Sequence, residues 1–376
     1  MKKIVAACDS FKGSLTSREA NLAVAEGVHD VLEDCEVLRF DMADGGEGTA
    51  GILTEILGGE SVEVLVHDPL MRPLKAAYGV AGDTAVIGMS SANGLALVPE
   101  NERNPLMTST FGTGEMILDA LRRGCRRFIM GLGGSATNDG GTGMLSALGF
   151  RFLDWSGNVV PGMGGSLREI AVIDSSSVTP LLSGCAFRAA CDVSTPFCGP
   201  DGASFVFGPQ KGASPECAAK LDEGMSSFAE AVSRFTGKDI GMMPGAGAAG
   251  GMGGALHAFL GAELIPGADL ILDAGGFREK ISGADLVITG EGCLDAQTVL
   301  GKAPAGVLKH CTGQGIPCIA AGGRVRDIDT LRAAGFGACL CITPEGMPES
   351  EAMRPETASG NLRRAIREAI TGIYKQ

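Results

Sequence analysis

The sequence predicts an α/β protein, and three features of the chain support that prediction. Short apolar runs of strand-like length alternate with segments of helical period, which is the pattern of parallel sheets covered by helices. Glycine or an acidic residue follows each apolar run. The two ends of the chain consist of strand–loop–helix units, whereas the middle is richer in glycine and short strands. We therefore expect two α/β domains with largely parallel sheets, one of them discontinuous and carrying both chain termini.

Six apolar runs are the clearest strand candidates. They cover residues 3–7, 37–40, 127–130, 187–191, 286–289 and 318–321. In open α/β sheets, ligands bind beyond the carboxyl ends of the strands. Because glycine or an acid follows each run, we expect these loops to form one active site in the cleft between the two domains.

Helices are predicted between the strands from their period and their caps. Thr16 and Glu19 form a capping box ahead of an apolar stripe at residues 20–31. Ser214 begins a longer helix that Gly237 ends. Further helices are expected at residues 113–123, 252–260, 303–314 and 362–374.

The domain boundaries are predicted from the places where this pattern changes. A proline-bounded stretch at residues 68–73 is the expected crossing out of the first domain, and Gly283 marks the expected return. The discontinuous domain would hold residues 1–70 and 284–376, and residues 71–283 would form the inserted domain. The alternative is a single cut near residue 180.

Composition excludes several classes of partner. The net charge of −13 argues against binding to nucleic acid or to an anionic membrane surface. An anionic ligand would have to be bound locally, by backbone N–H groups, by a few lysines or arginines, or by a metal ion. The segment at residues 246–260 is apolar but contains five glycines and lacks basic flanks, so it does not predict a membrane span.

Cysteine usage indicates a reducing compartment. The chain has 12 cysteines without a Cys-x-x-Cys pair, and its four histidines are isolated, so no zinc site is predicted. The N-terminal apolar run is too short for a signal peptide. We therefore expect a cytoplasmic protein, and the sequence leaves its oligomeric state open.

The most informative loop spans residues 131–143, between a predicted strand and a predicted helix. Six of its 13 residues are glycine, and the polar ones include Ser135, Thr137, Asn138 and Asp139. Glycine lets backbone N–H groups approach a ligand, and a helix N-terminus favours anions. Since Asp139 would repel a bare anion, a metal ion or a proton-accepting role would complement it. The alternative is a tight turn that simply requires glycine.

The available catalytic residues favour phosphoryl transfer. The chain has no Walker phosphate loop, no protein-kinase signature and no Gly-x-Ser-x-Gly elbow, and no histidine lies near an acid-rich loop. Carboxylates, amides, hydroxyls, lysines and backbone N–H groups remain, and this set suits ATP and Mg²⁺. Gly133 and Gly134 are candidates for phosphate contacts.

A second glycine-rich motif, at residues 245–250, matches the Gly-x-Gly-x-x-Gly pattern of dinucleotide-binding proteins. A poor strand ending in Pro244 precedes it, which argues against a Rossmann unit. We expect instead a phosphate-binding loop with contacts from Gly247, Gly250 and Gly251. Close packing of a helix through these glycines is the alternative.

Eight short patches, taken in order, resemble the bacterial glycerate kinase family, type 1. They begin at residues 7, 43, 112, 133, 191, 207, 244 and 289, and the resemblance extends from residue 3 to about 345. It implies a two-domain α/β fold and ATP- and Mg²⁺-dependent phosphorylation of D-glycerate, usually to 2-phosphoglycerate. Cys293 departs from the family, in which arginine is common at that position.

Catalytic roles are assigned to residues at the ends of two strands. Asp192 is the expected general base, because it ends a buried-looking strand and the following segment up to Pro196 would fix its backbone. The alternative is an Asx turn. Asp9 and Lys12 pair an acid with a cation after the first strand, and we assign Lys12 to an anionic group of a substrate. A surface lysine is the alternative.

Metal and substrate contacts are assigned to the remaining loops. Asp44 and Glu47 are the expected Mg²⁺ ligands, with N-capping of the next helix as the alternative. Lys211 is a second candidate for contacting the nucleotide. Glu291 and Asp295 flank a predicted turn and could bind either a metal ion or the hydroxyl groups of glycerate, with solvated turn acids as the alternative. The residues expected to contact glycerate are Ser10, Ser135, Asn138, Asp139, Glu291 and Asp295.

Two other functions remain open at this point. The motif at residues 245–250 would suit a nicotinamide-dependent dehydrogenase of hydroxy acids. The same loops could also serve a non-catalytic protein that binds a sugar acid. Whether the 2- or the 3-hydroxyl of glycerate accepts the phosphoryl group depends on fine placement of the substrate, which the sequence does not determine.

Overall fold

The computed structural model describes residues 1–42 and 49–375, and packing divides the chain into two compact units. The first unit comprises residues 1–44 and 268–376, and the second comprises residues 45–267. Each unit has its own hydrophobic core. The predicted domain boundaries after residues 70 and 283, and the predicted site in an inter-domain cleft, stay predictions.

The first unit contains a five-stranded parallel sheet in the order β13-β12-β11-β1-β2. Its strands are β1 (Lys3–Cys8), β2 (Glu36–Arg39), β11 (Leu286–Leu294), β12 (Cys318–Val325) and β13 (Ala338–Cys341). The four strands predicted in this unit are confirmed, but β11 and β12 are longer than expected. Gly290 and Gly322 let them lie close together, since a Cβ at Gly290 would collide with the Ala321 carbonyl oxygen of β12 and one at Gly322 would lie 2.9 Å from the Leu294 side chain of β11.

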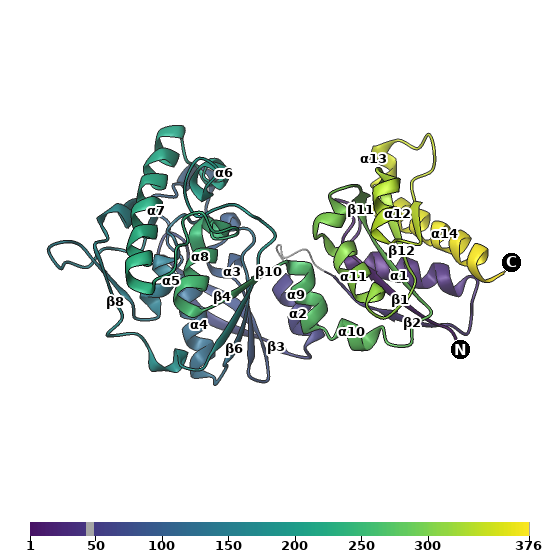
Figure 1. The fold of residues 1–376 in the computed structure, drawn as a ribbon, viewed down its shortest axis with the longest axis horizontal. Coiled ribbons are helices and arrows are strands. Elements are labelled where there is room, and N and C mark those ends of the chain that lie inside the picture. The colour runs from purple at the N-terminus through teal and green to yellow at the C-terminus, as the bar shows by residue number, and fades with distance from the viewer. Residues whose placement is uncertain (43–48, 376) are drawn as a thin grey trace. The chain divides into compact units, whose positions relative to one another are not determined.

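Helices α1 and α14 bring the two ends of the chain together (Figure 1). Thr16 and Glu19 form the predicted capping box at the start of α1. Arg363 on α14 donates to both carboxylate oxygens of Asp30, which follows α1. The helices of this unit are α1 (Ser17–His29), α9 (Gly267–Ala274), α10 (Phe277–Lys280), α11 (Ala303–Thr312), α12 (Ile328–Ala334), α13 (Glu349–Ala352) and α14 (Pro355–Tyr374).

The second unit contains a mixed six-stranded sheet in the order β10-β9-β6-β5-β4-β3. Its strands are β3 (Glu60–His67), β4 (Pro73–Ala81), β5 (Thr84–Gly88), β6 (Arg127–Gly131), β9 (Ala186–Ala190) and β10 (Glu263–Ile265). Strands β5, β6, β9 and β10 are parallel, whereas β3, β4 and β5 form an antiparallel meander.

The meander follows from its short connections, because a parallel pair needs a long crossover. Residues 68–72, the expected crossing between domains, form the turn between β3 and β4. The Asp68 carboxylate stabilises that turn by accepting hydrogen bonds from the N–H groups of Leu70 and Arg72. Only two residues connect β4 to β5.

The longest helix of the second unit, α7, has the caps that the sequence predicted. Ser214 caps the start of α7, and Gly237, with a φ of 74°, ends it. The unit's helices are α2 (Thr49–Ile56), α3 (Ser90–Asn93), α4 (Phe111–Arg122), α5 (Thr142–Ala147), α6 (Ala203–Phe207), α7 (Pro215–Thr236) and α8 (Ala248–Leu260), and its small hairpin is β7 (Arg151–Leu153) with β8 (Val172–Asp174).

Short 3₁₀ turns join several of these elements. They are η1 (Leu95–Leu97), η2 (Glu100–Glu102), η3 (Gly164–Glu169), η4 (Pro180–Leu182), η5 (Pro209–Lys211) and η6 (Thr298–Leu300). None of the helices in the described part of the chain combines the length and the apolar character needed to cross a bilayer.

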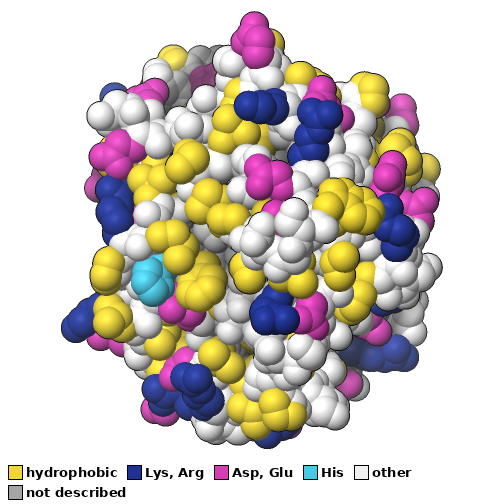
Figure 2. Space-filling model, turned by 90° about the vertical axis from the view of Figure 1, so that its left-hand side faces the viewer, with side chains coloured by type: hydrophobic (Ala, Val, Ile, Leu, Met, Phe, Trp, Pro, Cys, Tyr) yellow, Lys and Arg dark blue, Asp and Glu magenta, His cyan; other side chains and the backbone are white. Residues whose placement is uncertain are grey.

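Charges of both signs are interspersed on the face of the molecule shown in Figure 2. Hydrophobic side chains lie between them, and that face carries no large area of a single sign. Exposed ion pairs also occur, and in one of them Arg168 Nη1 lies 3.0 Å from Glu223 Oε2.

Candidate functional site

The parallel strands of the second unit end at one level. Gly88 of β5 pairs with Gly131 of β6, Gly131 pairs with Ala190 of β9, and Ala190 pairs with Ile265 of β10. The loops that follow these strands therefore begin side by side along one edge of the sheet. This is the edge at which α/β proteins bind ligands.

The glycine-rich loop after β6 is open to a ligand only near its start. Gly134 is exposed and Gly133 is half-buried, whereas residues 135–143 are buried. The carbonyl oxygens of Gly131 and Gly134 accept hydrogen bonds from the N–H groups of Met89 and Leu95. Among the described residues, the N–H groups of Gly133 and Gly134 have no hydrogen-bond acceptor. The loop thus presents two adjacent backbone donors at the end of a strand.

The anion at the N-terminus of α5 is the carboxylate of Asp139. This side chain is fully buried and accepts hydrogen bonds from the N–H groups of Thr110, Gly141 and Gly143 and from the Thr110 hydroxyl. Burial raises the pKa of Asp139, and the four donors act against that rise. The carboxylate therefore caps α4 and α5, and its predicted contact with substrate stays a prediction.

Lys211 contacts the same loop from the buried side. Its side chain comes from η5 and is only 2% exposed. The ammonium group donates to the Ser135 hydroxyl over 2.9 Å and to the Thr137 carbonyl oxygen over 2.7 Å. Burial lowers the pKa of Lys211 to about 7, and the nearby charge of Asp139 opposes this shift.

Two further polar atoms are buried beside Lys211. Asn138 donates to the Ser204 hydroxyl over 3.0 Å, which ties the loop to α6. Its Oδ1 and the hydroxyl of Thr137 have no hydrogen-bond partner among the described residues. Buried unsatisfied groups are rare and usually indicate an internal water or a ligand.

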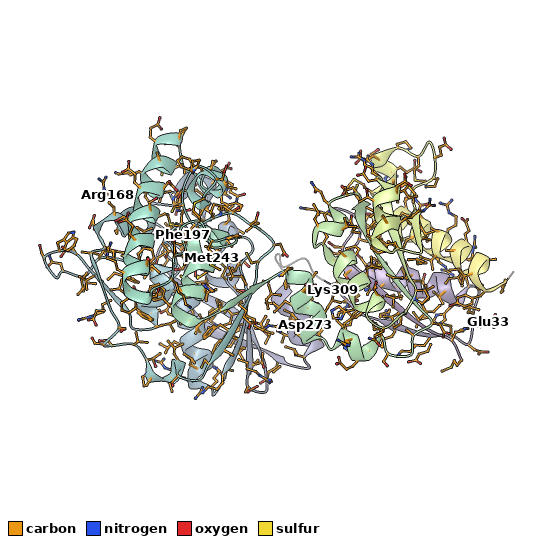
Figure 3. The ribbon with its side chains drawn as sticks, viewed as in Figure 1. Glu33, Arg168, Phe197, Met243, Asp273 and Lys309 are labelled. Carbon is orange, nitrogen blue, oxygen red and sulfur yellow. The ribbon has the colours of Figure 1, made fainter. Side chains whose placement is uncertain are left out.

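The glycines at the start of α8 contact protein atoms. A Cβ at Gly247 would collide with the Pro196 carbonyl oxygen, and one at Gly250 with the Thr137 carbonyl oxygen. A Cβ at Gly251 would lie 2.7 Å from the ring of Phe197, which is labelled in Figure 3. All three glycines are buried. These contacts agree with close packing, the alternative that the sequence left open, and the predicted phosphate contacts of the three glycines stay predictions.

Asp192 follows β9 at the same edge of the sheet. Its side chain is exposed, and its Oδ1 accepts a hydrogen bond from the N–H group of Gly267 over 2.8 Å. Gly267 follows β10, so this contact bridges the loops after two neighbouring strands. The carboxylate is thereby held at the end of a largely buried strand, as the sequence predicted for its backbone.

In the first unit, the residues after β1 lie beside β11. Asp9 is buried, and its N–H group donates to the Gly290 carbonyl oxygen over 2.8 Å. Its Oδ1 accepts a hydrogen bond from the N–H group of Ser10 over 2.7 Å. Lys12 is exposed. The structure thus places Asp9 and Ser10 at the base of this loop and Lys12 at its surface.

Glu291 lies within strand β11 and not at the edge of a turn as predicted. Its carboxylate accepts a hydrogen bond from the Thr298 hydroxyl over 2.6 Å and lies 3.4 Å from the Lys302 ammonium. That ammonium is also 3.7 Å from Asp295. Burial raises the pKa of Glu291, against the influence of Thr298 and Lys302. The two acids share one lysine, so this cluster offers both charge signs to a hydroxy acid.

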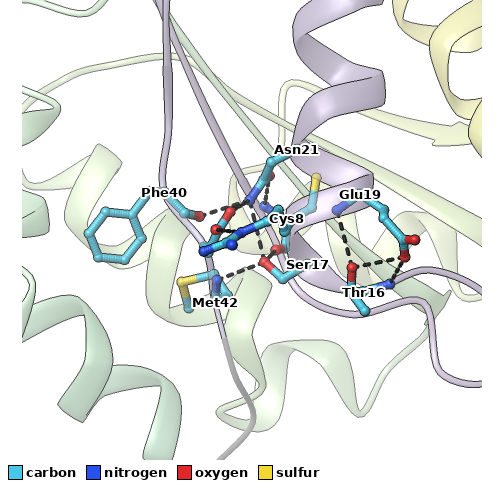
Figure 4. A network of polar contacts seen from close by, with 9 residues as sticks. Cys8, Thr16, Ser17, Glu19, Asn21, Phe40 and Met42 are labelled. Carbon is cyan, nitrogen blue, oxygen red and sulfur yellow. Dashed lines mark hydrogen bonds and ion pairs between the residues drawn. The ribbon is translucent and has the colours of Figure 1, made fainter. Parts of the chain in front are cut away.

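A polar network at the start of α1 was missed from the sequence (Figure 4). Asn21 is fully buried; its Oδ1 accepts from the Cys8 N–H group, and its Nδ2 donates to the Phe40 carbonyl oxygen. Ser17 donates to the Cys8 carbonyl oxygen and accepts from the Met42 N–H group. The hydrogen bonds of Asn21 and Ser17 thus hold the ends of β1 and β2 against α1. Two polar residues spaced four apart on an apolar stripe were the available signal.

The predicted Mg²⁺ ligands, Asp44 and Glu47, lie outside the described residues. Within residues 1–42 and 49–375, no three His, Cys, Asp or Glu side chains gather as a metal site. Mg²⁺ in phosphotransferases is commonly held by one or two carboxylates together with phosphate oxygens and water. Such a site needs no larger cluster of protein ligands.

Comparison with known proteins identifies close relatives. The model of the Glycerate kinase family matches residues 4–374. Glycerate kinase from Bacillus subtilis (strain 168) is 43% identical over 374 residues, which cover 99% of this chain and 97% of the relative. Glycerate 2-kinase from Escherichia coli (strain K12) is 42% identical over 376 residues, covering 99% and 95%. A crystal structure described as a candidate glycerate kinase 2 from Salmonella typhimurium LT2 has a TM-score of 0.86 at 41% identity and covers 100% of this chain and 98% of that one.

The packing of Gly250 predicts a large loss of stability on substitution. Gly250 and Gly261 have nearly equal φ values, 68° and 66°, but nothing lies within 4 Å of a Cβ at Gly261. We expect Gly250→Ala to lower the free energy of unfolding by about 2–4 kcal/mol, and Gly261→Ala by only about 1 kcal/mol. Urea denaturation measures both. Equal losses would show that Gly250 is not packed as described.

The buried amine of Lys211 predicts a pH-dependent stability. Its pKa is lowered to about 7 from 10.5, so the unfolded chain binds more protons between these values. The free energy of unfolding of the wild type should therefore rise with pH across this window, relative to Lys211→Met, by up to about 1.4 kcal/mol per pH unit. Denaturation of both proteins at several pH values between 6 and 10 tests this. A constant difference would contradict it.

Proposed function

The chain belongs to the glycerate kinase family and is a phosphotransferase that acts on glycerate. We propose that it transfers the γ-phosphoryl group of ATP to the 2-hydroxyl of D-glycerate with the help of Mg²⁺. One observation carries the proposal. The exposed start of the loop after β6 presents two backbone N–H groups that have no acceptor among the described residues, with a lysine behind them.

The loop after β6 suits the phosphates of ATP. Backbone N–H groups of glycine bind phosphate oxygens closely, because no side chain intervenes. A Cβ at Gly134 would meet its nearest atom, on Ser90, at 3.5 Å, so space remains above the loop. We assign the phosphate contacts to Gly133 and Gly134. Lys211, for which the sequence predicted a contact with the nucleotide, is buried and donates to Ser135 of this loop.

Two clusters of the first unit suit a short hydroxy acid. The ammonium groups of Lys12 and Lys302 are candidates for the carboxylate of glycerate. Asp9, Glu291 and Asp295 could accept hydrogen bonds from its hydroxyl groups. Because the side chains of Glu291 and Asp295 share Lys302, binding of an anion to this lysine would change the charge balance of all three groups.

Asp192 is the proposed general base. The attacking hydroxyl oxygen of glycerate forms a bond to the γ-phosphorus while the bond between that phosphorus and ADP breaks, and the Asp192 carboxylate takes the hydroxyl proton. Its contact with Gly267 N–H holds one carboxylate oxygen, and a carboxylate has lone pairs on both oxygens. Mg²⁺ would neutralise phosphate charge, and Asp44 and Glu47 are its proposed ligands.

The nicotinamide-dependent alternative finds no support in the structure. In its motif, at residues 245–250, Gly247 packs against Pro196 and Gly250 packs against Thr137, which are contacts of helix packing. The E. coli relative carries the name glycerate 2-kinase, which favours the 2-hydroxyl as the acceptor.

Phosphorus NMR of the product tests the whole proposal. The protein is incubated with ATP, Mg²⁺ and D-glycerate, and the proton-coupled ³¹P signal of the new monoester is recorded. A phosphate on the 2-oxygen neighbours one C–H proton and gives a doublet, whereas one on the 3-oxygen neighbours two and gives a triplet. We expect the doublet. A triplet would reject the 2-hydroxyl, and the absence of any monoester would reject ATP-dependent transfer.

Replacing Asp192 tests the base. Asn keeps an oxygen that accepts the Gly267 N–H bond but cannot take a proton, so Asp192→Asn should lower kcat by about 10²–10⁴-fold with ATP affinity nearly unchanged. Asp201→Asn, at another exposed acid of this unit, is the matched control and should leave kcat unchanged. A fully active Asp192→Asn would exclude this residue as the base.

A further inference from the structure

We propose that Lys211 is a positioning residue for the loop after β6. From its buried position it donates hydrogen bonds to Ser135 and Thr137, and these bonds help to set the conformation of Gly133 and Gly134. This inference rests on the proposed function, because it assumes that these glycines bind ATP phosphates. It assigns to Lys211 an action through the loop and not a direct contact with phosphate.

The backbone around Lys211 is fixed before its side chain enters the unit. Lys211 ends η5, and the following Gly212 has a φ of 94°. A Cβ at Gly212 would collide with the Arg103 carbonyl oxygen, so the turn is packed against the segment around η2. The Lys211 N–H group also donates to the Gly208 carbonyl oxygen over 2.9 Å. The lysine side chain is therefore directed inward by its own turn.

The ammonium group reaches two points of the loop that are far away in sequence. Ser135 is 76 residues distant and Thr137 is 74 residues distant, and both are buried. Ser135 directly follows the exposed Gly134. Loss of the amine would leave a buried hydroxyl and a buried carbonyl without a donor, which is a costly state.

Backbone hydrogen bonds hold other points of the loop, among them the Gly134 carbonyl oxygen, which accepts from the Leu95 N–H group over 2.8 Å. The Gly140 N–H group donates to the Gly250 carbonyl oxygen over 3.0 Å, and Asp139 caps α5. The Ala136 N–H group donates to the Asn93 carbonyl oxygen over 2.9 Å. In addition to these contacts, Lys211 donates to the Ser135 hydroxyl and to the Thr137 carbonyl oxygen.

The burial of Lys211 distinguishes it from a lysine that binds phosphate directly. With 2% exposure, its amine has little access to a ligand in solvent, whereas Gly134 is exposed. The low pKa near 7 agrees with an amine that sits inside the protein and has no carboxylate directly bonded to it. A surface lysine that binds phosphates would keep its charge at neutral pH.

The test compares hydrogen bonding with charge at position 211. Lys211→Met removes the donors, and Lys211→Gln keeps two amide donors on a slightly shorter side chain without a charge. Positioning predicts that Lys211→Met weakens ATP binding and raises the KM for ATP by about tenfold or more, with the KM for glycerate within twofold of wild type. Lys211→Gln should recover a large part of this loss. Lys220→Met, at an exposed lysine of α7, is the matched control.

A double-mutant cycle with Ser135→Ala shows whether Lys211 acts through the loop. If it does, the KM for ATP of the double variant Lys211→Met/Ser135→Ala should be no more than about twofold higher than that of Lys211→Met alone. If the two effects multiply, or if Lys211→Gln is as poor as Lys211→Met, the proposal is wrong and the charge acts on the ligand. Wild-type affinity in Lys211→Met would overturn it as well.

Two measurements keep the result interpretable. Near-ultraviolet circular dichroism and a melting curve check that each variant is folded, and Lys211→Gln with Ser135→Ala supplies the cycle if Lys211→Met does not fold. Calorimetric titration with ATP is run beside the activity assay. A wild type that binds ATP but does not phosphorylate glycerate would refute the proposed function, whereas the outcomes above concern Lys211 alone.

Discussion

The buried carboxylate of Asp139 is the interaction on which the arrangement of the second unit depends. It takes four hydrogen bonds from the starts of α4 and α5, so two helices and the loop after β6 meet at one charged group. A buried charge is tolerated only when it is fully hydrogen-bonded. Because these donors come from different segments, the packing of α4 against α5 and the course of the loop are determined together.

Both units use buried polar side chains to fix the loops at their strand ends. In the second unit Lys211 reaches the loop after β6 from η5. In the first unit Ser17 and Asn21 reach from α1 to the ends of β1 and β2. Loops held in this way can present backbone N–H groups and carboxylates in a defined geometry, which catalysis by positioning requires.

Glycine serves two different purposes in this chain, and the sequence does not distinguish them. At Gly133 and Gly134 it leaves backbone donors open at an exposed point. At Gly247, Gly250 and Gly251 it lets α8 pack against neighbouring backbone and side chains. Both groups of glycines lie in motifs that suggest phosphate binding, and only the surrounding atoms separate them.

The sequence by itself determined the elements whose signals are local. Apolar runs predicted the six strands, and Thr16 with Glu19 predicted a capping box, because these preferences act over a few neighbouring residues. The family resemblance, and with it the activity, also followed from short motifs in order. The tertiary structure alone decided the antiparallel meander, the capping role of Asp139 and the burial of Lys211. Each of these depends on partners distant in the chain, such as Ser135, which lies 76 residues from Lys211.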